Sequence, residues 1–245
     1  MTEDKKKKLK RLLINILVLA IIFGFLSIKY KYFDSREDYN PEPEIVISYD
    51  NWYEDIPEYS GEPFAIINDG VPFFSVESLT TEPFEIYSPL DELGRCGPAY
   101  ANICIEIMPT EDRGSISTIK PTGWQSTKYD IISGKYLYNR CHLIGFQLAG
   151  ENANELNLIT GTRYLNVTGM LPFENMVADF VKEMDYHVLY RVTPYFIDDE
   201  LVARGVLIEA ISVEDTGDGI KFCVYCYNIQ PGIIIDYNTG LSSLE

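Results

Sequence analysis

Apolar residues divide the chain into three regions. An uncharged run extends from Leu12 to Ile28, an acidic stretch follows, and short apolar segments separated by polar turns continue to the end of the chain. The short apolar segments of this third region are rich in β-branched and aromatic residues and are bounded by Gly, Asp and Asn, which is typical of β-strands. The pattern therefore predicts a strand-rich domain over residues 62–245.

Several segments of this domain have the form of strands or hairpins. The segment "PFAIINDGVPFF" predicts a hairpin whose turn is Asn68-Asp69-Gly70, and "LGRCGPAYANICIEIMP" predicts a further strand. A second hairpin is expected to open at Ser133-Gly134, within "SGKYLYNRCHLIGFQL". Near the end of the chain, "YHVLYRVTPYF", "LVARGVLIEAISV" and "IKFCVYCYNI" are separated by short polar turns and predict an antiparallel meander.

One helix stands out between these strands. Apolar residues recur with helical spacing from Phe173 to Met184, and Pro172 suits the first position of a helix. Strands dominate and one helical segment is inserted among them, so we predict a single α+β domain with an antiparallel β-sheet core.

The first 61 residues differ from this domain. The basic segment "KKKKLKR" precedes the uncharged run, which at about 1.5 Å per residue is long enough for a short membrane span. We expect a cytoplasmic tail over residues 1–11, a transmembrane helix over residues 12–30 and an acidic spacer over residues 31–61, with the domain outside the cell. A cleaved signal peptide is the alternative, but "FGFLSIKYKYF" offers no clear cleavage site.

Charge is distributed unevenly along the chain. The formal net charge is -17, and residues 33–112 hold nineteen acidic residues against two basic ones. Residues 120–182, in contrast, hold six basic residues against five acidic ones. The acidity therefore does not exclude a polyanionic substrate from this second region, although no basic patch is visible in the sequence.

A candidate for chemistry lies in this less acidic region. The segment "YNRCHLIGFQLAG" places Arg140, Cys141 and His142 within an apolar run. Histidine is the natural general base near neutral pH, but hydrolysis of a phosphodiester also requires stabilisation of negative charge, which a hard divalent cation with oxygen ligands supplies. Candidate oxygen ligands follow in "NELNLITGTRYLNVTGMLPFEN": Asn157, Asn166 and Glu174.

These segments carry a family resemblance. Over roughly residues 62–237, "NRCHLIGFQLAG", "NLITGTRYLN", "PFEN" and "YRVTPYF" resemble the DNA/RNA non-specific endonucleases of the ββα-metal superfamily, and among these the membrane-anchored nucleases of bacteria. The resemblance implies a ββα-metal unit inserted in the sheet domain, a Mg²⁺ or Mn²⁺ cofactor, and DNA, with RNA as a second substrate.

The resemblance also implies a role for each matching residue. His142 would activate the attacking water, Asn166 would bind the metal, Asn157 would orient the substrate or the site, and Glu174 would hold metal-bound water. The guanidinium of Arg140 matches the arginine of the family's Asp-Arg-Gly-His motif and would contact phosphate. Arg163 is a further candidate phosphate contact.

The motif departs from the family at two positions, since Asn139 replaces Asp and Cys141 replaces Gly. Asn139 remains a candidate substrate-binding residue, but it lacks the charge of an aspartate. A catalytically inactive domain that binds nucleic acid or a partner on the same scaffold is therefore the alternative function.

Other candidates have plainer interpretations. The triplet Asp112-Arg113-Gly114 repeats part of the family motif but is followed by serine, and we interpret it as a polar turn. Cys223 and Cys226 have CxxC spacing without a second pair, and adjacent Cys141 and His142 would face opposite sides of a strand. His187, in an alternating strand, is interpreted as structural, and Glu174 alternatively only stabilises the dipole of its helix.

Overall fold

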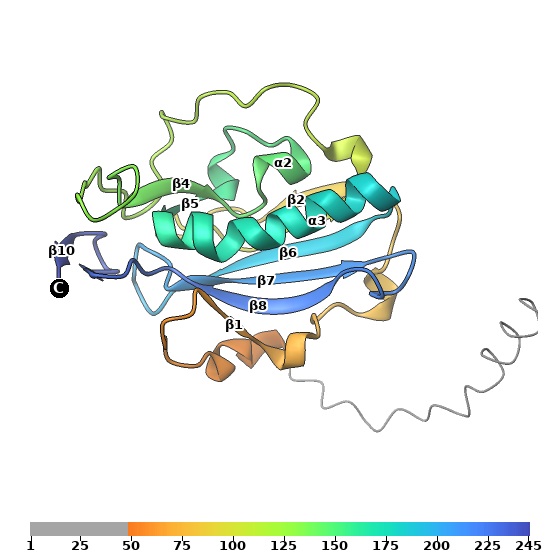
Figure 1. Ribbon diagram of the computed structural model, residues 1–245, viewed down its shortest axis with the longest axis horizontal. Helices are drawn as coiled ribbons and strands as arrows, with labels where there is room; N and C mark the ends of the chain where they lie inside the picture. Colours follow the sequence, from red (N-terminus) through yellow and green to blue (C-terminus); the bar gives the residue numbers. More distant parts are fainter. Residues whose placement is uncertain (1–48) are drawn as a thin grey trace, which may run out of the picture. The chain divides into compact units, whose positions relative to one another are not determined.

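The computed structural model describes residues 49–245, and its main element is a six-stranded sheet (Figure 1). Every neighbouring pair of strands in it is antiparallel. In spatial order the strands are β1 (Phe64–Ile66), β8 (Lys221–Tyr227), β7 (Gly205–Ser212), β6 (Val188–Tyr195), β3 (Ala99–Ile103) and β2 (Phe84–Tyr87). The predicted strand in the segment of β3 and the predicted meander of β6, β7 and β8 are confirmed.

A second unit lies on one side of this sheet (Figure 1). It consists of the antiparallel pair β4 (Tyr138–His142) and β5 (Leu158–Thr162), followed by a π-helix, η6 (Leu165–Met170), and helix α3 (Leu171–Met184). The short helix α2 (Phe146–Ala149) and the 3-10 helix η5 (Glu155–Asn157) lie in the connection between the two strands. The predicted strand-strand-helix unit is thus present, and the sequence prediction places the start of α3 within one residue.

Helix α3 forms because its apolar residues share one face. Phe173, Val177, Ala178 and Val181 are buried from this helix, and they belong to the same core cluster as Val188, Tyr190 and Val192 of β6. The helix ends where Asp185 adopts a left-handed conformation and its N–H donates to the Val181 carbonyl. Cys141 and Leu143 also belong to this core, so α3 and β4 are fixed to the sheet through the same apolar contacts.

A smaller apolar cluster contains side chains of β7 and β8 together with the 3-10 helix η1 (Tyr49–Asp55). Trp52 is buried there, and its ring contacts Tyr195 and Tyr225 at centroid distances of 5.7 and 6.1 Å. Part of the segment expected to be a spacer, residues 49–61, therefore packs against the sheet.

The hairpin predicted around Asn68-Asp69-Gly70 is wrong. Strand β1 pairs with β8 instead, and Asn68–Gly70 (η2) forms a 3-10 turn after which the chain leaves the sheet. The Phe73 N–H then donates to the buried Glu209 carboxylate at 2.8 Å. Pairing with β8 is favoured because β1 then covers the edge of a strand that is buried along nearly its whole length.

The hairpin expected at Ser133-Gly134 is present in a short form. Lys128 and Tyr136 form an antiparallel bridge across this turn, whereas β4 itself pairs with β5. The remaining short elements are η3 (Val76–Ser78), η4 (Ile105–Ile107) and the strand pair β9 (Ile233–Ile235) and β10 (Ser242–Leu244).

The predicted tail and anchor, residues 1–30, lie outside the described residues. Within residues 49–245 we find no helix that is both long and apolar enough to cross a bilayer.

Candidate active site

The last residue of β4 is His142, and its buried ring is held at both nitrogens. Its Nε2 lies 2.8 Å from the carbonyl oxygen of Asn152, and its Nδ1 lies 3.3 Å from Nη2 of Arg113. A carbonyl oxygen only accepts hydrogen bonds, so Nε2 carries the proton of the neutral ring and Nδ1 keeps its lone pair. The site therefore presents Nδ1 as the basic atom.

Burial of His142, which is 5% exposed, lowers the pKa of its imidazole below the ordinary value of 6.5. The positive charge of Arg113 also lowers this pKa, while the hydrogen bond to Asn152 opposes both effects. The ring is consequently neutral at pH 7, which is the state that a general base requires.

Arg113 is the functional candidate that the sequence interpretation missed. The Asp112-Arg113-Gly114 triplet is not an isolated polar turn, because the guanidinium of Arg113 contacts the His142 ring from 29 residues away in the sequence. One signal was present, since Arg113 is a lone basic residue at the end of a strongly acidic stretch. Which residue Arg113 contacts, however, depends on how the loop before β4 folds, and the sequence pattern does not show this.

A wide groove opens beside these residues, with a volume of about 890 Å³. Four of its lining side chains are basic, and among the described residues that line it none is acidic. The basic residues are Arg113, Lys120, Arg140 and Arg163. In a chain with a net charge of -17, this local excess of positive charge makes the groove suited to a polyanion.

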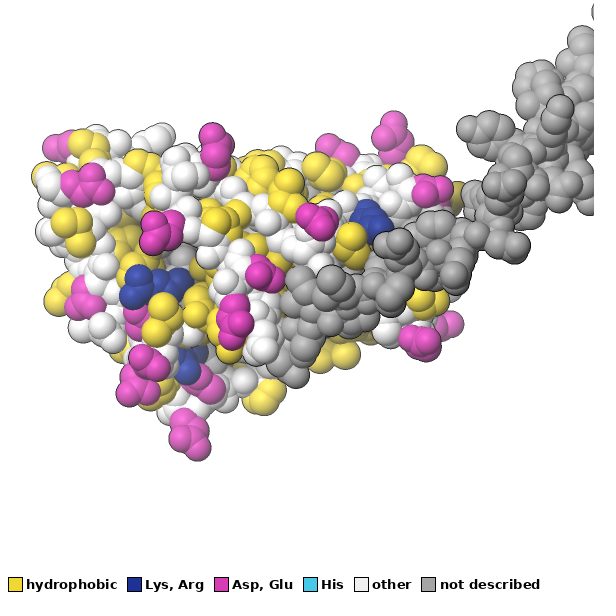
Figure 2. All heavy atoms as spheres, turned by 90° about the horizontal axis from the view of Figure 1, so that it is seen from below, with side chains coloured by type: hydrophobic (Ala, Val, Ile, Leu, Met, Phe, Trp, Pro, Cys, Tyr) yellow, Lys and Arg dark blue, Asp and Glu magenta, His cyan; other side chains and the backbone are white. Residues whose placement is uncertain are grey.

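Other parts of the surface have the opposite character. Figure 2 shows the side on which η1 and β1 lie, where acidic side chains are scattered over the surface and basic ones are few. The groove is thus an exception to the general acidity of the protein.

Three predicted substrate contacts, Asn139, Arg140 and Arg163, do line the groove. Arg140 lies over the Trp124 ring, with its Cζ 4.1 Å from the ring centroid, and donates to the carbonyls of Ser117 and Ile119. These contacts fix the guanidinium on the groove wall and leave some of its N–H groups available. The Nδ2 of Asn139 is buried and has no hydrogen-bond partner in the described part of the chain.

Asn166, the predicted metal ligand, also lines the groove and is partly exposed on η6. Its Oδ1 lies 3.2 Å from the Cys141 sulfur, so the thiol donates to this oxygen and orients it. Room for the Cys141 side chain comes from Gly161, where an added Cβ would lie 2.6 Å from the Cβ of Cys141. Cys141 in place of the family glycine therefore acts on the carboxamide of Asn166.

The donor set fits a hard divalent cation. A carboxamide oxygen at the wall of a wide, polar groove supplies one protein ligand and leaves space for waters and a phosphate oxygen. Mg²⁺ is commonly held in this manner, with few protein ligands and several waters.

Asn157 is not part of the groove. It is fully buried, its Oδ1 accepts from the Ile144 N–H at 2.9 Å, and its Nδ2 donates to the Ile144 carbonyl at 3.0 Å. Contact of Asn157 with substrate, one of the two roles expected from the sequence, is excluded by this burial. Its amide instead holds the chain that follows His142 against the start of β5. The other expected role, orienting the site, stays a prediction.

Glu174 lies in the first turn of α3, with only 9% of its surface exposed. Burial raises the pKa of its carboxyl to about 7, and a hydrogen bond from Gln147 and the charge of Arg113 oppose this rise. Stabilisation of the helix dipole alone does not explain the position, because an exposed carboxylate would serve that purpose without the cost of burial.

A glycine makes room for this carboxyl. A Cβ added to Gly145 would lie 2.6 Å from Oε2 of Glu174. We expect Gly145→Ala to displace the carboxyl and to reduce cleavage by roughly tenfold or more, since misplacing a catalytic group by about 1 Å costs up to 100-fold. Steady-state cleavage kinetics and thermal unfolding measure the effect. A variant with the wild-type rate would show that the carboxyl position is not required.

Comparison with known proteins identifies a family and a relative for this chain. Residues 76–214 match the family model for the DNA/RNA non-specific endonuclease. A curated deoxyribonuclease from Streptococcus dysgalactiae subsp. equisimilis is 33% identical over 110 residues, which are 43% of this chain and 32% of that protein. The match therefore spans about a third of the length of this curated relative.

Solved structures share the fold. NucA from Streptococcus agalactiae with a magnesium ion bound is 24% identical, with a TM-score of 0.69, over 80% of this chain and 93% of that one. The Sda1 nuclease with a bound zinc ion is 26% identical, with a TM-score of 0.61, over 75% of this chain and 96% of that one. With more than half of the chain matched by the family model, the protein belongs to the DNA/RNA non-specific endonuclease family.

Proposed function

We propose that this protein is a divalent-metal-dependent endonuclease that hydrolyses phosphodiester bonds of DNA, and of RNA as a second substrate, with little sequence preference. The observation that carries this proposal is the groove, which is lined by four basic side chains and the Asn166 carboxamide. One of the four, Arg113, contacts the ring of His142. The deoxyribonuclease relative and the zinc-bound Sda1 nuclease support a nucleic-acid substrate and a divalent ion.

Low sequence preference follows from the kind of contact that the groove offers. Guanidinium and ammonium groups bind phosphate oxygens, and contacts to the backbone of a nucleic acid carry no direct sequence information. Tyr136 also lines the groove, and its exposed ring can stack on any base.

In the proposed reaction, Nδ1 of His142 takes the proton of a water that attacks phosphorus, while the Asn152 carbonyl keeps the Nε2 proton in place. The guanidinium of Arg113, now beside Nδ1, donates to the phosphate when substrate fills the groove and thereby releases Nδ1 for water. Asn166 would hold a Mg²⁺ or Mn²⁺ ion, which supplies stabilisation of the negative charge at the phosphate and the leaving oxygen. Glu174 would hold a water of that ion.

A plasmid-nicking assay with the full-length protein tests the proposal. Cleavage in Mg²⁺ that EDTA abolishes and added Mg²⁺ restores supports it. Retention of DNA in a mobility-shift assay without any cleavage, in Mg²⁺ or in Mn²⁺, would instead identify an inactive binding domain.

The Arg113 contact makes a separate prediction. Arg113→Ala is expected to lower kcat/KM for DNA by roughly 100-fold, the scale of losing one charge-stabilising donor at a transition state. Lys182→Ala is the matched control, because it removes one positive charge from an exposed position in the last turn of α3, outside the groove. Both variants are compared at one ionic strength, since binding of a polyanion depends on salt. Equal losses of kcat/KM in the two variants would show that Arg113 contributes only through the net charge of the protein.

The pH dependence follows from the lowered pKa of His142. Neutral imidazole is the active form, so kcat/KM should rise with pH through a value below 6.5 and be level above it. Because the pKa of Glu174 is raised to about 7, the profile is measured in the Glu174→Gln background as well, where the remaining acid limb belongs to His142. A limb above 6.5 in that background would contradict the assignment.

For the segments before the domain, we propose a cytoplasmic tail over residues 1–11, a single membrane-spanning helix over residues 12–30 and a spacer before an extracellular nuclease domain. The proposal is supported by the basic flank and the uncharged run. Protease treatment of intact cells, followed by detection of the domain and of a tag on residue 1, tests it. Protection of the domain from the protease would mean that it lies inside the cell, and would contradict the proposal.

A further inference from the structure

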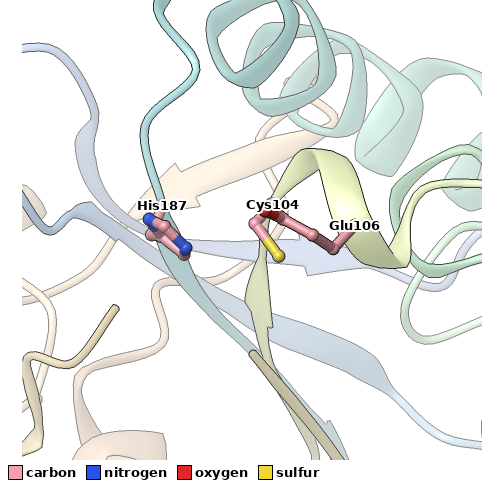
Figure 3. A group of neighbouring side chains, drawn as sticks. All are labelled: Cys104, Glu106 and His187. Carbon is pink, nitrogen blue, oxygen red and sulfur yellow. The ribbon is translucent and has the colours of Figure 1, made fainter. Parts of the chain in front are cut away.

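A second group of metal-binding side chains lies apart from the groove (Figure 3). It consists of Cys104, Glu106 and His187, whose ligand atoms all lie within 4.8 Å of one another. Cys104 is buried, His187 is partly exposed and Glu106 is exposed, so the group opens to solvent on one side. None of the three lines the groove or has a part in the proposed nuclease reaction.

The sheet brings these residues together. Strands β3 and β6 are antiparallel neighbours, and Ile103 pairs with Val188 at the end of their ladder. Cys104 follows β3 and His187 precedes β6, so the two side chains lie beside each other just beyond that last pair. The chain then turns through η4, and the Glu106 side chain extends back toward Cys104, as Figure 3 shows. The Cys104 thiol and the Glu106 carboxylate are hydrogen-bonded.

The ring of His187 is held in place by a neighbouring carboxylate. Its Nδ1 lies 2.6 Å from Oε1 of Glu214, and its backbone N–H donates to Oε2 of the same carboxylate at 2.8 Å. This pair of contacts makes Nδ1 the protonated nitrogen and leaves Nε2 with a lone pair. Histidines that bind metals are typically held in this way, with the distal ring nitrogen donating to a carboxylate.

We propose that Cys104, Glu106 and His187 form a second metal site, one that binds a single Zn²⁺ ion or another borderline divalent cation. Sulfur, imidazole nitrogen and carboxylate oxygen are together the ligands of tetrahedral zinc, with water in the fourth position. A thiolate disfavours Mg²⁺, which prefers oxygen ligands alone, so the two sites of the protein differ in the metal that they select.

Such an ion connects the end of β3, the turn η4 and the start of β6. It would bind mainly the folded chain, because His187 is far from Cys104 and Glu106 in the sequence, and so it would stabilise the fold by linkage. Glu214 is a positioning residue for His187 and not a ligand.

Titration of the full-length protein with Co²⁺ in excess Mg²⁺ tests the proposal, because Co²⁺ replaces Zn²⁺ and a thiolate ligand gives an absorption band in the near ultraviolet. We expect this band at one equivalent of Co²⁺, its loss when Zn²⁺ is added, and a rise in Tm with Zn²⁺ of roughly 5 °C at 100-fold excess over Kd. The Cys104→Ser and His187→Ala variants should lose the band. Glu214→Gln should weaken Zn²⁺ binding by roughly 10- to 100-fold.

Two controls keep the result interpretable. Glu106→Gln changes an exposed side chain, so it should weaken binding in a folded protein even where Cys104→Ser fails to fold. Cys96→Ser alters another buried thiol, which donates to backbone carbonyls, and should keep the band. Absence of the band in the wild type, or its persistence in Glu106→Gln and His187→Ala, would overturn the proposal. His142→Ala and Asn166→Ala should retain the band, so failure of the nuclease proposal would leave this one intact.

Discussion

Replacing His142 with alanine is expected to lower the rate of DNA cleavage by roughly 100- to 10,000-fold, the range for loss of a general base. The geometry supports an effect of this size. The ring is buried, its Nε2 proton is fixed by the Asn152 carbonyl, and its Nδ1 faces Arg113 at the wall of the groove. No other imidazole can take over this role, because the second histidine of the chain, His187, binds Glu214.

The measurement is single-turnover cleavage at saturating protein, which separates the chemical step from substrate binding. Thermal unfolding shows whether the variant is folded, since removal of a buried ring also costs stability. Partial recovery of cleavage with added imidazole would identify the missing base directly. More than a few per cent of wild-type activity without imidazole would remove His142 from the mechanism.

Local patterns in the sequence were sufficient for much of the fold. The spacing of Phe173, Val177 and Val181 predicts helix α3, because a helical face against a core imposes that period. The pattern also predicts strands β6, β7 and β8, because consecutive apolar runs joined by short turns favour antiparallel neighbours. The prediction of a hairpin at Asn68–Gly70 is wrong because the turn residues specify a reversal of chain direction but not the partner of the strand before it.

The candidate site shows the same division. The positions of His142 and Asn166 follow from a strand, a loop and a helix that are close in the sequence, so their spacing was informative. Arg113 reaches His142 from a loop, and no periodicity indicates where such a loop folds. Asn157 has the expected spacing, but its burial depends on the path of the chain at Ile144, and the sequence gives no measure of that. Cys104 and His187 are neighbours only because β3 pairs with β6, and the sequence alone does not identify that strand pair.

These particulars bear on the two departures from the family motif. Cys141 donates to the Asn166 carboxamide, and Gly161 on the paired strand leaves room for it. This substitution is thus accommodated within the site and does not by itself indicate an inactive protein. Asn139 has an unsatisfied donor within the described structure. An aspartate there would have no such donor, so Asn139→Asp tests whether the carboxamide is adapted to this site.

Asn166→Ala is expected to abolish most of the cleavage, with a loss of at least about 100-fold at saturating Mg²⁺, the scale of losing one group that stabilises transition-state charge. Its carboxamide is partly exposed in the groove, and one oxygen ligand of the ion would be lost with it. The Mg²⁺ concentration for half-maximal activity should rise in the same variant. Asn166→Asp restores an oxygen ligand and should bind Mg²⁺ more tightly than the alanine variant.

Thr168→Ala is the matched control for this prediction, because Thr168 is exposed on the same π-helix two residues away. It should keep the wild-type rate and Mg²⁺ dependence, and both variants are to be checked by thermal unfolding. A loss of activity in Asn166→Ala with an unchanged Mg²⁺ requirement would mean that the carboxamide positions substrate and does not bind the ion. The thiol of Cys141 orients Oδ1 of Asn166, so a second variant separates the two roles of Asn166, metal ligand and substrate contact. If Asn166 binds the ion, Cys141→Ala should change the Mg²⁺ requirement. If Asn166 positions substrate, the Mg²⁺ requirement of Cys141→Ala should equal that of the wild type.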